Sequence, residues 1–424
     1  MDSKDRRRKI IYILLDGIGD LPHPDLNYLT PLEAAYTPNL DRLARLSRMG
    51  MVYTVSKDIA PESDIAVFSM LGYRFNEHEY VGRGIIEAIG AGIDVKDGDL
   101  ALRGNFATID SKGYIIDRRV GRSVSDAEAK ELVKAINDNV KLSDATFDLV
   151  HTKGHRVVLR IRSNERLSAD ISNTDPAYER VKGMGVAKGN GSKLRLVECK
   201  ALSNDHAALR ASMLVNEFTN MAINVLKDHA VNARRRSMGM LEANCILLRD
   251  AGDRLPDVKA LSSIYGLRFA CIVDMPVEQG IAKVTGMHAF NAGNMHDYEI
   301  KANTALKALE HYDCVYVHLK GPDEFGHDGD ARGKKRSVED IDRRFFSIIN
   351  DAIGNDVCIV VTGDHSTPCI KKAHTSDPVP LLVACNGIKD DRLARFTEHN
   401  ARKGSIGYIM GYEVLNTALK IIHS

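Results

Sequence analysis

The sequence predicts an α/β protein. Short apolar runs rich in β-branched residues recur along the chain, and each is followed by a polar loop and then by a helical period. The length of 424 residues allows two to three domains, and a hydrophobic fraction of 44% supplies enough apolar side chains for their cores. The middle of the chain shows a different pattern of strands and helices from its two ends.

The first half opens with a buried strand at residues 10–15, and a second strand is expected at 51–55. Between them, Thr37 and Pro38 fit the cap and first turn of a helix that places Leu40, Leu43 and Ala44 on one face.

Three more buried strands are predicted late in the chain, at residues 314–319, 357–361 and 379–384. A helix is expected between the first two. Ser337 fits its cap, and five apolar side chains share one face: Val338, Ile341, Phe345, Ile348 and Ile349.

In the middle, strands at 156–161 and 194–199 alternate with helices at 126–139 and 205–227. Ser125 and Glu128 form a capping box before the first helix. Residues 182–193 are rich in glycine and lysine but lack the spacing of a nucleotide-binding loop, so they predict a surface loop rather than a phosphate cradle.

Charge and cysteine content narrow the class of protein. The 58 Lys and Arg nearly balance the 57 Asp and Glu, which predicts no general attraction to nucleic acid or to anionic membranes. The longest apolar run, residues 10–15, is far shorter than the roughly 20 residues that span a bilayer. The seven cysteines are odd in number and have no close pairing, which predicts reduced, buried thiols in a cytoplasmic protein.

Potential metal ligands lie next to the ends of the predicted strands. In open α/β sheets, ligands bind outside the carboxyl ends of the strands, so a polar residue at such a place is a functional candidate. Three aspartates and three histidines have this position: Asp16, Asp323, His327, Asp364, His365 and His374.

Taken one at a time, these residues have ordinary structural explanations, since a strand-end aspartate often forms a turn. Together at one sheet edge they would repel and desolvate one another unless cations neutralised them. Imidazole and carboxylate without thiolate favour Mn²⁺, Zn²⁺, Co²⁺ or Fe²⁺. Because six ligands are too many for one catalytic ion with open positions, the set predicts two divalent ions.

Ser63 is the predicted nucleophile, because it lies where a loop enters an apolar helix. A serine there is commonly only a cap, but Ala66 three residues later provides no capping box. Free N–H groups at a helix start attract phosphate, and a metal-bound serine hydroxyl can ionise near neutral pH and attack phosphorus.

These motifs, in this order, resemble those of the alkaline phosphatase superfamily. More narrowly, the chain resembles the archaeal-type 2,3-bisphosphoglycerate-independent phosphoglycerate mutases, and the match extends over most of its length. Five separated motifs carry it: residues 16–17, 61–64, 323–327, 363–368 and 373–375. Further matching segments are residues 30–35, 104–108, 117–122 and 377–382.

The resemblance implies specific roles for these residues. Ser63 would be the phosphorylated nucleophile and would share one metal with Asp16, Asp364 and His365. Asp323, His327 and His374 would hold the other. Mn²⁺ is the first expectation, with Zn²⁺, Co²⁺ or Mg²⁺ as alternatives, and no bisphosphoglycerate would be needed. Glu62 departs from the family, which more usually has glycine before the nucleophile.

The family fold implies an alkaline-phosphatase-like doubly wound sheet core with a second α/β or α+β domain inserted in it. The expected bounds are residues 1–95 and 288–424 for the metal-binding core, and 96–287 for a substrate-binding insert. The insert would exclude water, because a phosphoserine that meets water gives a phosphatase rather than a mutase.

A phosphate and a carboxylate that reorient in a site need several guanidinium donors. Asp117 and Arg118 are the best candidate pair, since the acid could orient the arginine and take a proton during transfer. The other substrate candidates are Arg103, Arg119, Arg122, His155, Arg156, Arg234, Arg235 and Lys283, with Arg236 as an alternative in its run.

The resemblance therefore implies interconversion of 3-phosphoglycerate and 2-phosphoglycerate in glycolysis and gluconeogenesis. The expected partner is the small-molecule substrate, and no binding to nucleic acid or membrane is expected. The sequence leaves open whether the protein forms a homo-oligomer. Two alternatives remain: a metal-dependent phosphomonoesterase or another sugar-phosphate mutase on the same core, and a non-catalytic homologue. The presence of all seven expected metal-site residues argues against the last.

Overall fold

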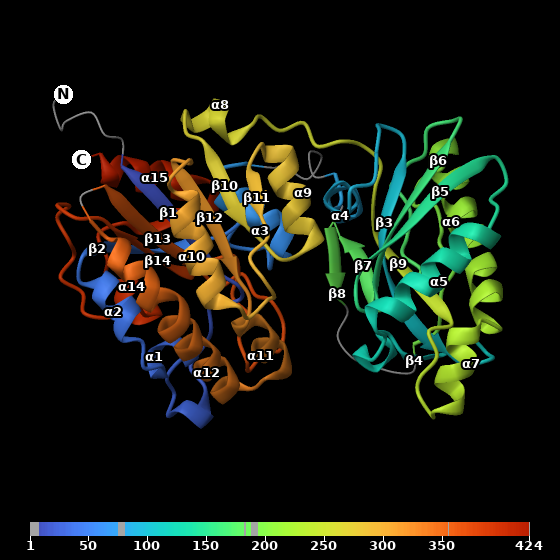
Figure 1. The fold of residues 1–424 in the computed structure, drawn as a ribbon, viewed down its shortest axis with the longest axis horizontal. Coiled ribbons are helices and arrows are strands. Elements are labelled where there is room, and N and C mark those ends of the chain that lie inside the picture. Colours follow the sequence, from blue (N-terminus) through green and yellow to red (C-terminus); the bar gives the residue numbers. More distant parts are fainter. Residues whose placement is uncertain (1–7, 75–80, 182–183, 188–193, 355, 424) are drawn as a thin grey trace. The chain divides into compact units, whose positions relative to one another are not determined.

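The computed structural model describes residues 8–74, 81–181, 184–187, 194–354 and 356–423. The chain forms two compact units (Figure 1). The first unit comprises Met1–Arg74, Val258–Met275 and Ala282–Ser424, and the second comprises Phe75–Asp257 and Pro276–Ile281. Both combine helices with a sheet, which confirms the predicted α/β class.

The unit boundaries differ from the expected 95/96 and 287/288 for two packing reasons. Helix α4 (Arg83–Gly90) packs against strands β3 (Leu100–Ile109) and β9 (Cys245–Gly252), so it belongs to the second unit. Strand β10 (Phe269–Ile272) pairs with β12 (Cys314–Leu319), so it belongs to the first.

The first unit is built on an eight-stranded sheet of order β11-β10-β12-β1-β13-β14-β2-β15. Besides β10 and β12, its strands are β1 (Lys9–Leu15), β2 (Ser47–Tyr53), β11 (His288–Phe290), β13 (Val357–Gly363), β14 (Val379–Ala384) and β15 (Gly407–Met410). All are parallel except β14, which runs antiparallel to both neighbours. The predicted buried strands are present, but the one at 379–384 is antiparallel.

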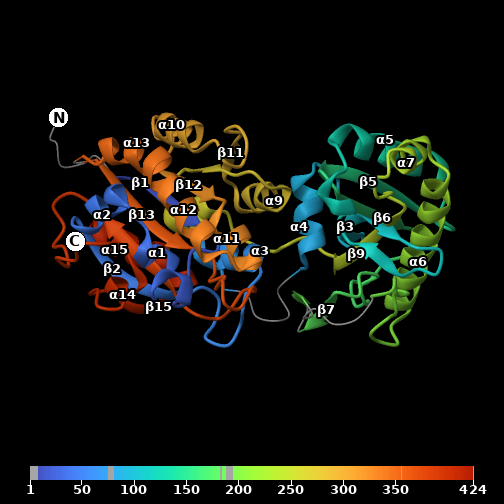
Figure 2. The same ribbon diagram turned by 90° about the horizontal axis from the view of Figure 1, so that it is seen from below.

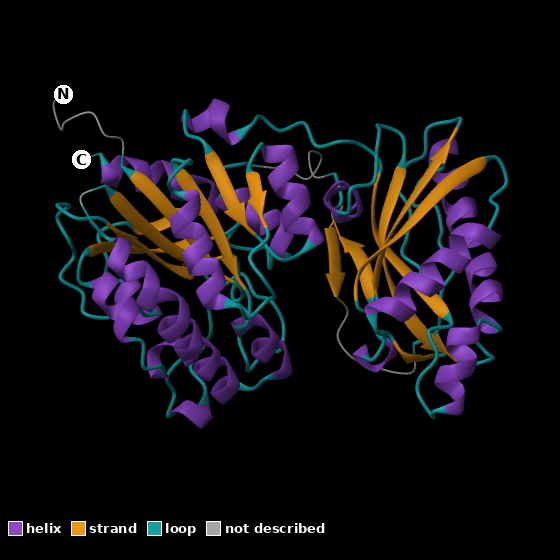
Figure 3. Ribbon diagram, viewed as in Figure 1, coloured by secondary structure: helices purple, strands orange, loops and turns teal. Residues whose placement is uncertain are grey.

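Helices cover both faces of this sheet, as a doubly wound architecture requires (Figures 2 and 3). On one face, α2 (Pro38–Ala44), α10 (Tyr298–Ala308) and α12 (Ala331–Ile341) bury apolar side chains against Ile11 and Ile13 of β1. On the other, Tyr12 donates a hydrogen bond to the Met70 carbonyl at the end of α3 (Ser63–Met70).

Shorter or peripheral helices complete the first unit: α1 (Pro31–Ala34), α8 (Leu261–Tyr265), α11 (Pro322–Asp328), α13 (Ser347–Ile349), α14 (Glu398–Ala401) and α15 (Val414–Ile422). Helix α9 (Pro276–Thr285) crosses the unit boundary.

The second unit has a five-stranded sheet in which β3 is central. The path β4-β3-β6-β5 joins β4 (Ile115–Asp117), β6 (Arg156–Ser163) and β5 (Ala145–Lys153) to it, and β9 also pairs with β3. Helices α5 (Asp126–Asn139), α6 (His206–Lys227) and α7 (Ala230–Ser237) cover one face, and α4 packs on the other (Figure 2).

Some local predictions were wrong. Residues 194–199 form only an isolated bridge, between Arg195 and Tyr114, instead of a strand. The expected surface loop at 182–193 includes a strand, β8 (Met184–Ala187), paired with β7 (Tyr178–Val181); residues 182–183 and 188–193 lie outside the described part.

Two caps also differ from expectation. Ser337 lies inside α12, whose cap is Asp330, because the helix begins seven residues earlier than its apolar stripe suggests. Helix α12 continues through a π-helical turn, Asp342–Phe346, into α13. Thr37 precedes α2 but makes no capping hydrogen bond.

The cysteine prediction needs a correction. Cys358 on β13 and Cys385 just after β14 form a disulfide, because the antiparallel pairing of these strands brings their Cα atoms to 4.5 Å. The other five cysteines are buried and form no disulfide among the described residues. Among the described residues, no helix combines the length and the apolar character needed to cross a membrane.

Candidate functional site

The strand-end side chains of the first unit converge at one sheet edge. His365 Nε2 lies 3.2 Å from Ser63 Oγ, 3.3 Å from Asp364 Oδ2 and 3.4 Å from Asp16 Oδ1. Asp16 follows β1, and Asp364 and His365 follow β13, its hydrogen-bonded neighbour. The structure therefore brings together the four residues expected to share one metal.

The other three predicted ligands form a second group beside the first. Asp323 Oδ1 lies 3.5 Å from His374 Nε2, and Asp323 Oδ2 lies 3.6 Å from His327 Nε2. His327 and His374 face each other with their Nε2 atoms 3.2 Å apart. The rings of His365 and His374 stack at 3.8 Å, which joins the two groups.

His374 reaches this edge because β14 runs antiparallel to β13. The residues before β14 therefore lie at the same end of the sheet as the residues after β13. Its Nδ1 lies 2.8 Å from the carbonyl oxygen of Pro61, two residues before Ser63. This contact ties the histidine to the loop that carries the nucleophile candidate.

A close backbone approach permits this convergence. Gly17 has a positive φ of 62°, and a Cβ atom placed there would lie 2.8 Å from the Cα atom of Asp323. Only glycine fits such a position without displacing a ligand-bearing segment.

Electrostatics set the protonation of these groups. Burial raises the pKa of Asp16 to about 7, although the Lys320 ammonium 3.1 Å away opposes this. Burial lowers the pKa of His365 to about 4. Burial also opposes the charging of His374, but its contact with Asp323 outweighs this and raises the pKa of His374 to about 10. The clustered charges thus perturb one another strongly.

The donor set fits divalent cations. Asp16 Oδ1 and Asp364 Oδ2 are buried, yet neither accepts a hydrogen bond within the described part of the chain. Two groups offer ligand atoms within 4.8 Å of one another: Asp323 with His365 and His374, and Asp16 with His318 and Asp364. Buried carboxylate oxygens without donors are where a cation would compensate the desolvated charge.

Sequence reasoning missed His318 and Lys320. His318 is fully buried on β12, and its Nε2 lies 3.3 Å from Asp364 Oδ2 and 4.0 Å from Asp16 Oδ1. A histidine inside an otherwise apolar buried strand was the available signal, because such a side chain needs a polar partner.

Ser63 is the first residue of α3, and Glu62 is its N-cap residue without a side-chain capping bond. Ser63 is therefore not the cap of its helix, and its hydroxyl is directed to His365 instead.

The second unit gathers arginines on one face of its sheet. Arg103 on β3 lies opposite Arg249 on β9, and Asn105, two residues on, lies opposite Arg156 on β6. Since side chains two apart in a strand share a face, this register places the three arginines together. The opposite face, which includes Leu102, packs against α5 and α6.

Asp175 and Tyr178 contact both Arg249 and the neighbouring Arg118. Asp175 is fully buried and accepts from Arg118 at 2.6 Å and from Arg249 at 3.4 Å. The Tyr178 ring centroid lies 5.0 Å from the Arg118 guanidinium carbon and 4.8 Å from that of Arg249. The expected orienting acid, Asp117, instead accepts from the backbone N–H of Arg119. Asp175 and Arg249 are thus further candidates that sequence reasoning missed.

The positive charge at this face lowers neighbouring pKa values. Burial, together with Arg156, Arg119, Arg249 and Arg122, lowers the pKa of His155 to about 3. Burial and Arg103 lower the pKa of Arg156 to about 10. His155 is therefore neutral near pH 7, and the face is suited to an anion.

Other predicted substrate residues lie elsewhere. Arg235 is fully buried and donates to Ser123, Glu128 and Leu241, so its donors are committed to the fold. Arg234 pairs with Glu131 and Arg236 with Glu242, all away from the buried interior. Lys283 lies exposed on the part of α9 that belongs to the first unit.

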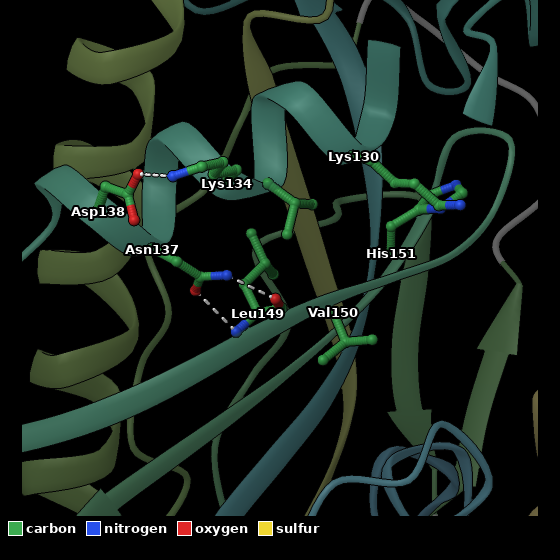
Figure 4. Close-up of a pocket in the computed structure, with 8 residues that line it drawn as sticks. Lys130, Lys134, Asn137, Asp138, Leu149, Val150 and His151 are labelled. Atoms are coloured by element: carbon green, nitrogen blue, oxygen red, sulfur yellow. Dashed lines mark hydrogen bonds and ion pairs between the residues drawn. The ribbon is translucent and has the colours of Figure 1, made fainter. Parts of the chain in front are cut away.

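A separate hollow lies between α5 and β5, lined by Lys130, Val133, Lys134, Asn137, Asp138, Leu149, Val150 and His151 (Figure 4). Lys134 pairs with Asp138, and Asn137 binds the Leu149 main chain (Figure 4). None of the predicted site residues lines it.

Comparisons with known proteins show what the whole chain is similar to. A family model described as 2,3-bisphosphoglycerate-independent phosphoglycerate mutase matches residues 44–232. A protein of that name from Aeropyrum pernix is 44% identical, over 98% of this chain and 99% of its own. One from Methanopyrus kandleri is 38% identical, over 96% of this chain and 95% of its own.

Two solved structures are similar over nearly the whole chain. The structure of PH0037 protein from Pyrococcus horikoshii has a TM-score of 0.79 at 29% identity and covers 98% of both chains. A cofactor-independent phosphoglycerate mutase from Thermoplasma acidophilum has a TM-score of 0.65 at 31% identity, over 98% of this chain and 100% of its own.

Proposed function

Since the chain belongs to the family of 2,3-bisphosphoglycerate-independent phosphoglycerate mutases, which are isomerases, we propose that it interconverts 3-phosphoglycerate and 2-phosphoglycerate through a phosphoserine on Ser63. The observation that carries this proposal is the position of Ser63 Oγ, 3.2 Å from His365 Nε2 and beside the carboxylates of Asp16 and Asp364. No bisphosphoglycerate takes part in this scheme.

Two divalent cations belong to the proposal. Asp16, Ser63, Asp364 and His365 would hold one, with His318 adjacent, and Asp323, His327 and His374 the other. His365 also lies within reach of Asp323 and His374, between the two groups. When bound, the cations would supply Lewis acidity that favours the ionised Ser63 hydroxyl and neutralises the transferring phosphoryl group. Mn²⁺ suits this mixture of imidazole and carboxylate, and Zn²⁺, Co²⁺ or Mg²⁺ are the alternatives.

The chain's own residues divide the remaining work. The Ser63 oxygen attacks phosphorus as the bond to the glycerate oxygen breaks, and the other glycerate hydroxyl later takes the phosphoryl group back. The arginine face, with Arg103, Arg118, Arg156 and Arg249, would hold the substrate carboxylate and phosphate between these steps. Arg119, Arg122 and His155 lie beside it.

Retention of the glycerate separates this scheme from a phosphatase. Once Ser63 carries the phosphoryl group, water would release it as phosphate, so the second unit must hold the glycerate and exclude water during reorientation.

The test is a metal-stripped sample reconstituted with Mn²⁺ and given 3-phosphoglycerate without bisphosphoglycerate, with 2-phosphoglycerate and free phosphate followed together. Isomerisation with little phosphate release is expected. Release of phosphate alone would show that the protein is a phosphomonoesterase rather than a mutase. If neither product forms, both hypotheses are wrong.

Ser63→Ala tests the covalent step in the same assay. We expect the variant to lose isomerisation and to form no phosphoryl adduct by mass spectrometry, with unchanged circular dichroism, because a loop-edge serine normally contributes little stability. Ser262→Ala, at an exposed serine in the first turn of α8, is the matched control and should turn over normally. Near-normal turnover in Ser63→Ala would end the covalent mechanism.

A further inference from the structure

A fully buried lysine on α12 joins the segments that carry the proposed metal ligands. The Lys334 ammonium donates to Asp20 Oδ2 at 2.8 Å, to the Thr367 carbonyl at 2.9 Å and to the Gly19 carbonyl at 3.1 Å. An ammonium has three donors, so these three acceptors satisfy it completely.

The three contacts reach two segments of the proposed metal centre. Gly19 and Asp20 follow Asp16 in the turn after β1, and Thr367 follows Asp364 and His365 in the loop after β13. Lys334 itself lies on the helix that follows α11, which carries Asp323 and His327. Asp20 makes a second link, because it also accepts from the Cys369 N–H at 3.1 Å.

Thr367 extends this connection to the ligands themselves. Its hydroxyl donates to Asp323 Oδ1 at 2.6 Å and lies 3.0 Å from His365 Nδ1. Asp323 and His365 belong to different halves of the proposed two-metal centre. A shift of Thr367 would therefore change the spacing between the two metal positions.

Stability alone is a weak explanation for such a group. A buried ion pair gains little over well-packed apolar side chains, because desolvation of both charges offsets their attraction. What distinguishes Lys334 is where its acceptors lie, since all three belong to ligand-bearing segments.

We propose that Lys334 is a positioning residue, which, through Asp20 and Thr367, fixes the spacing of the ligand-bearing segments at the sheet edge. This inference rests on the metal centre of the proposed function. Groups that orient metal ligands typically change metal affinity 10–100-fold when they are removed.

The chain offers a matched control in Lys301 on α10. It is also fully buried, and its ammonium donates to Asp274 at 2.6 Å and to the carbonyls of Asn294 at 2.8 Å and Ala292 at 3.5 Å. Each lysine thus donates to one carboxylate and two carbonyls. The acceptors of Lys301, however, lie outside the segments that contact Lys334.

The experiment is calorimetric titration of metal-stripped wild type, Lys334→Met and Lys301→Met with Mn²⁺, with thermal melts in parallel. Lys334→Met is expected to bind Mn²⁺ roughly tenfold or more weakly. Lys301→Met should lose comparable stability but keep wild-type affinity. Equal Mn²⁺ affinity in the two variants would overturn the positioning role.

Asp20→Asn keeps the inference testable if Lys334→Met does not fold, since the two carbonyls would still accept from Lys334. Weaker Mn²⁺ binding than in Asp274→Asn supports the inference, and equal binding overturns it. If the wild type does not bind Mn²⁺, the metal centre of the proposed function is wrong. If the wild type binds Mn²⁺ and Lys334→Met binds it equally well, only the positioning role is wrong.

Discussion

In both units, burial and neighbouring charged groups determine the orientation and the pKa of single side chains. Arg118 is an example, because a fully buried carboxylate, Asp175, fixes one edge of its guanidinium while its side chain remains 24% exposed. An arginine held in this way loses little freedom when it binds an anion with its remaining donors.

With Arg118 in the proposed role of a substrate donor, Arg118→Ala should lower kcat/KM for phosphoglycerate by roughly 100-fold, since a charge-assisted contact of about 2–3 kcal/mol would be lost. Hydrolysis of a small aryl phosphate should fall much less, because it has no carboxylate to hold. The exposed Arg236→Ala is the control. Equal losses on both substrates would show that Arg118 does not hold the glycerate.

Glu398 is a buried acid that belongs to neither candidate site. Burial raises its pKa to about 7, although a hydrogen bond from Thr30 at 2.8 Å opposes this. An unfolded glutamate titrates near pH 4.3. Between these values the native state keeps a proton that the unfolded state has lost, so stability falls as the pH rises through this window.

Glu398→Gln cannot ionise and should lose this dependence. From pH 4.5 to 8, its free energy of unfolding should gain about 1–3 kcal/mol relative to wild type. Urea unfolding in the presence of chelator measures this, with the exposed Glu310→Gln as control. Parallel pH profiles for wild type and Glu398→Gln would contradict the assignment.

At the scale of elements, one arginine ties two helices together. Arg235 on α7 reaches Glu128 on α5 at 3.0 Å, and Glu128 is also part of the capping box of Ser125. The pair thus couples the start of α5 to α7, and it explains why the middle arginine of its run faces inward.

Arg235→Met should destabilise the chain by about 3 kcal/mol or more, because Glu128 and buried carbonyls lose their donor. Arg236→Met, next in sequence but exposed, should change stability by less than about 0.5 kcal/mol. Thermal melting compares the two variants. Equal melting temperatures would show that the contact between Arg235 and Glu128 does not stabilise the fold.

At the scale of the whole molecule, the sheet edge of the first unit concentrates carboxylates that need a counter-charge. Asp16 and Asp364 each leave a buried oxygen without a hydrogen bond among the described residues. A cation that binds only the folded state stabilises it by mass action.

Mn²⁺ at 100 times its dissociation constant should therefore add about 2.7 kcal/mol to the free energy of unfolding, and chelator should remove this gain. Asp364→Asn should lose most of the effect, whereas His311→Ala, at an exposed histidine, should keep it. Melting curves with and without Mn²⁺ test this; identical curves for wild type would argue against a metal centre.

Local patterns in the sequence were enough to predict the α/β class, most buried strands and the ligand-type residues at their ends. A strand and the residue that follows it are adjacent in the chain, so their relation needs no tertiary information. Only the tertiary structure decided the rest, because it depends on pairing between distant segments. Cross-strand register places Arg249 beside Arg103. Antiparallel β14 brings Cys385 to Cys358 and His374 to the sheet edge that carries the other candidate ligands, and Arg235 is buried.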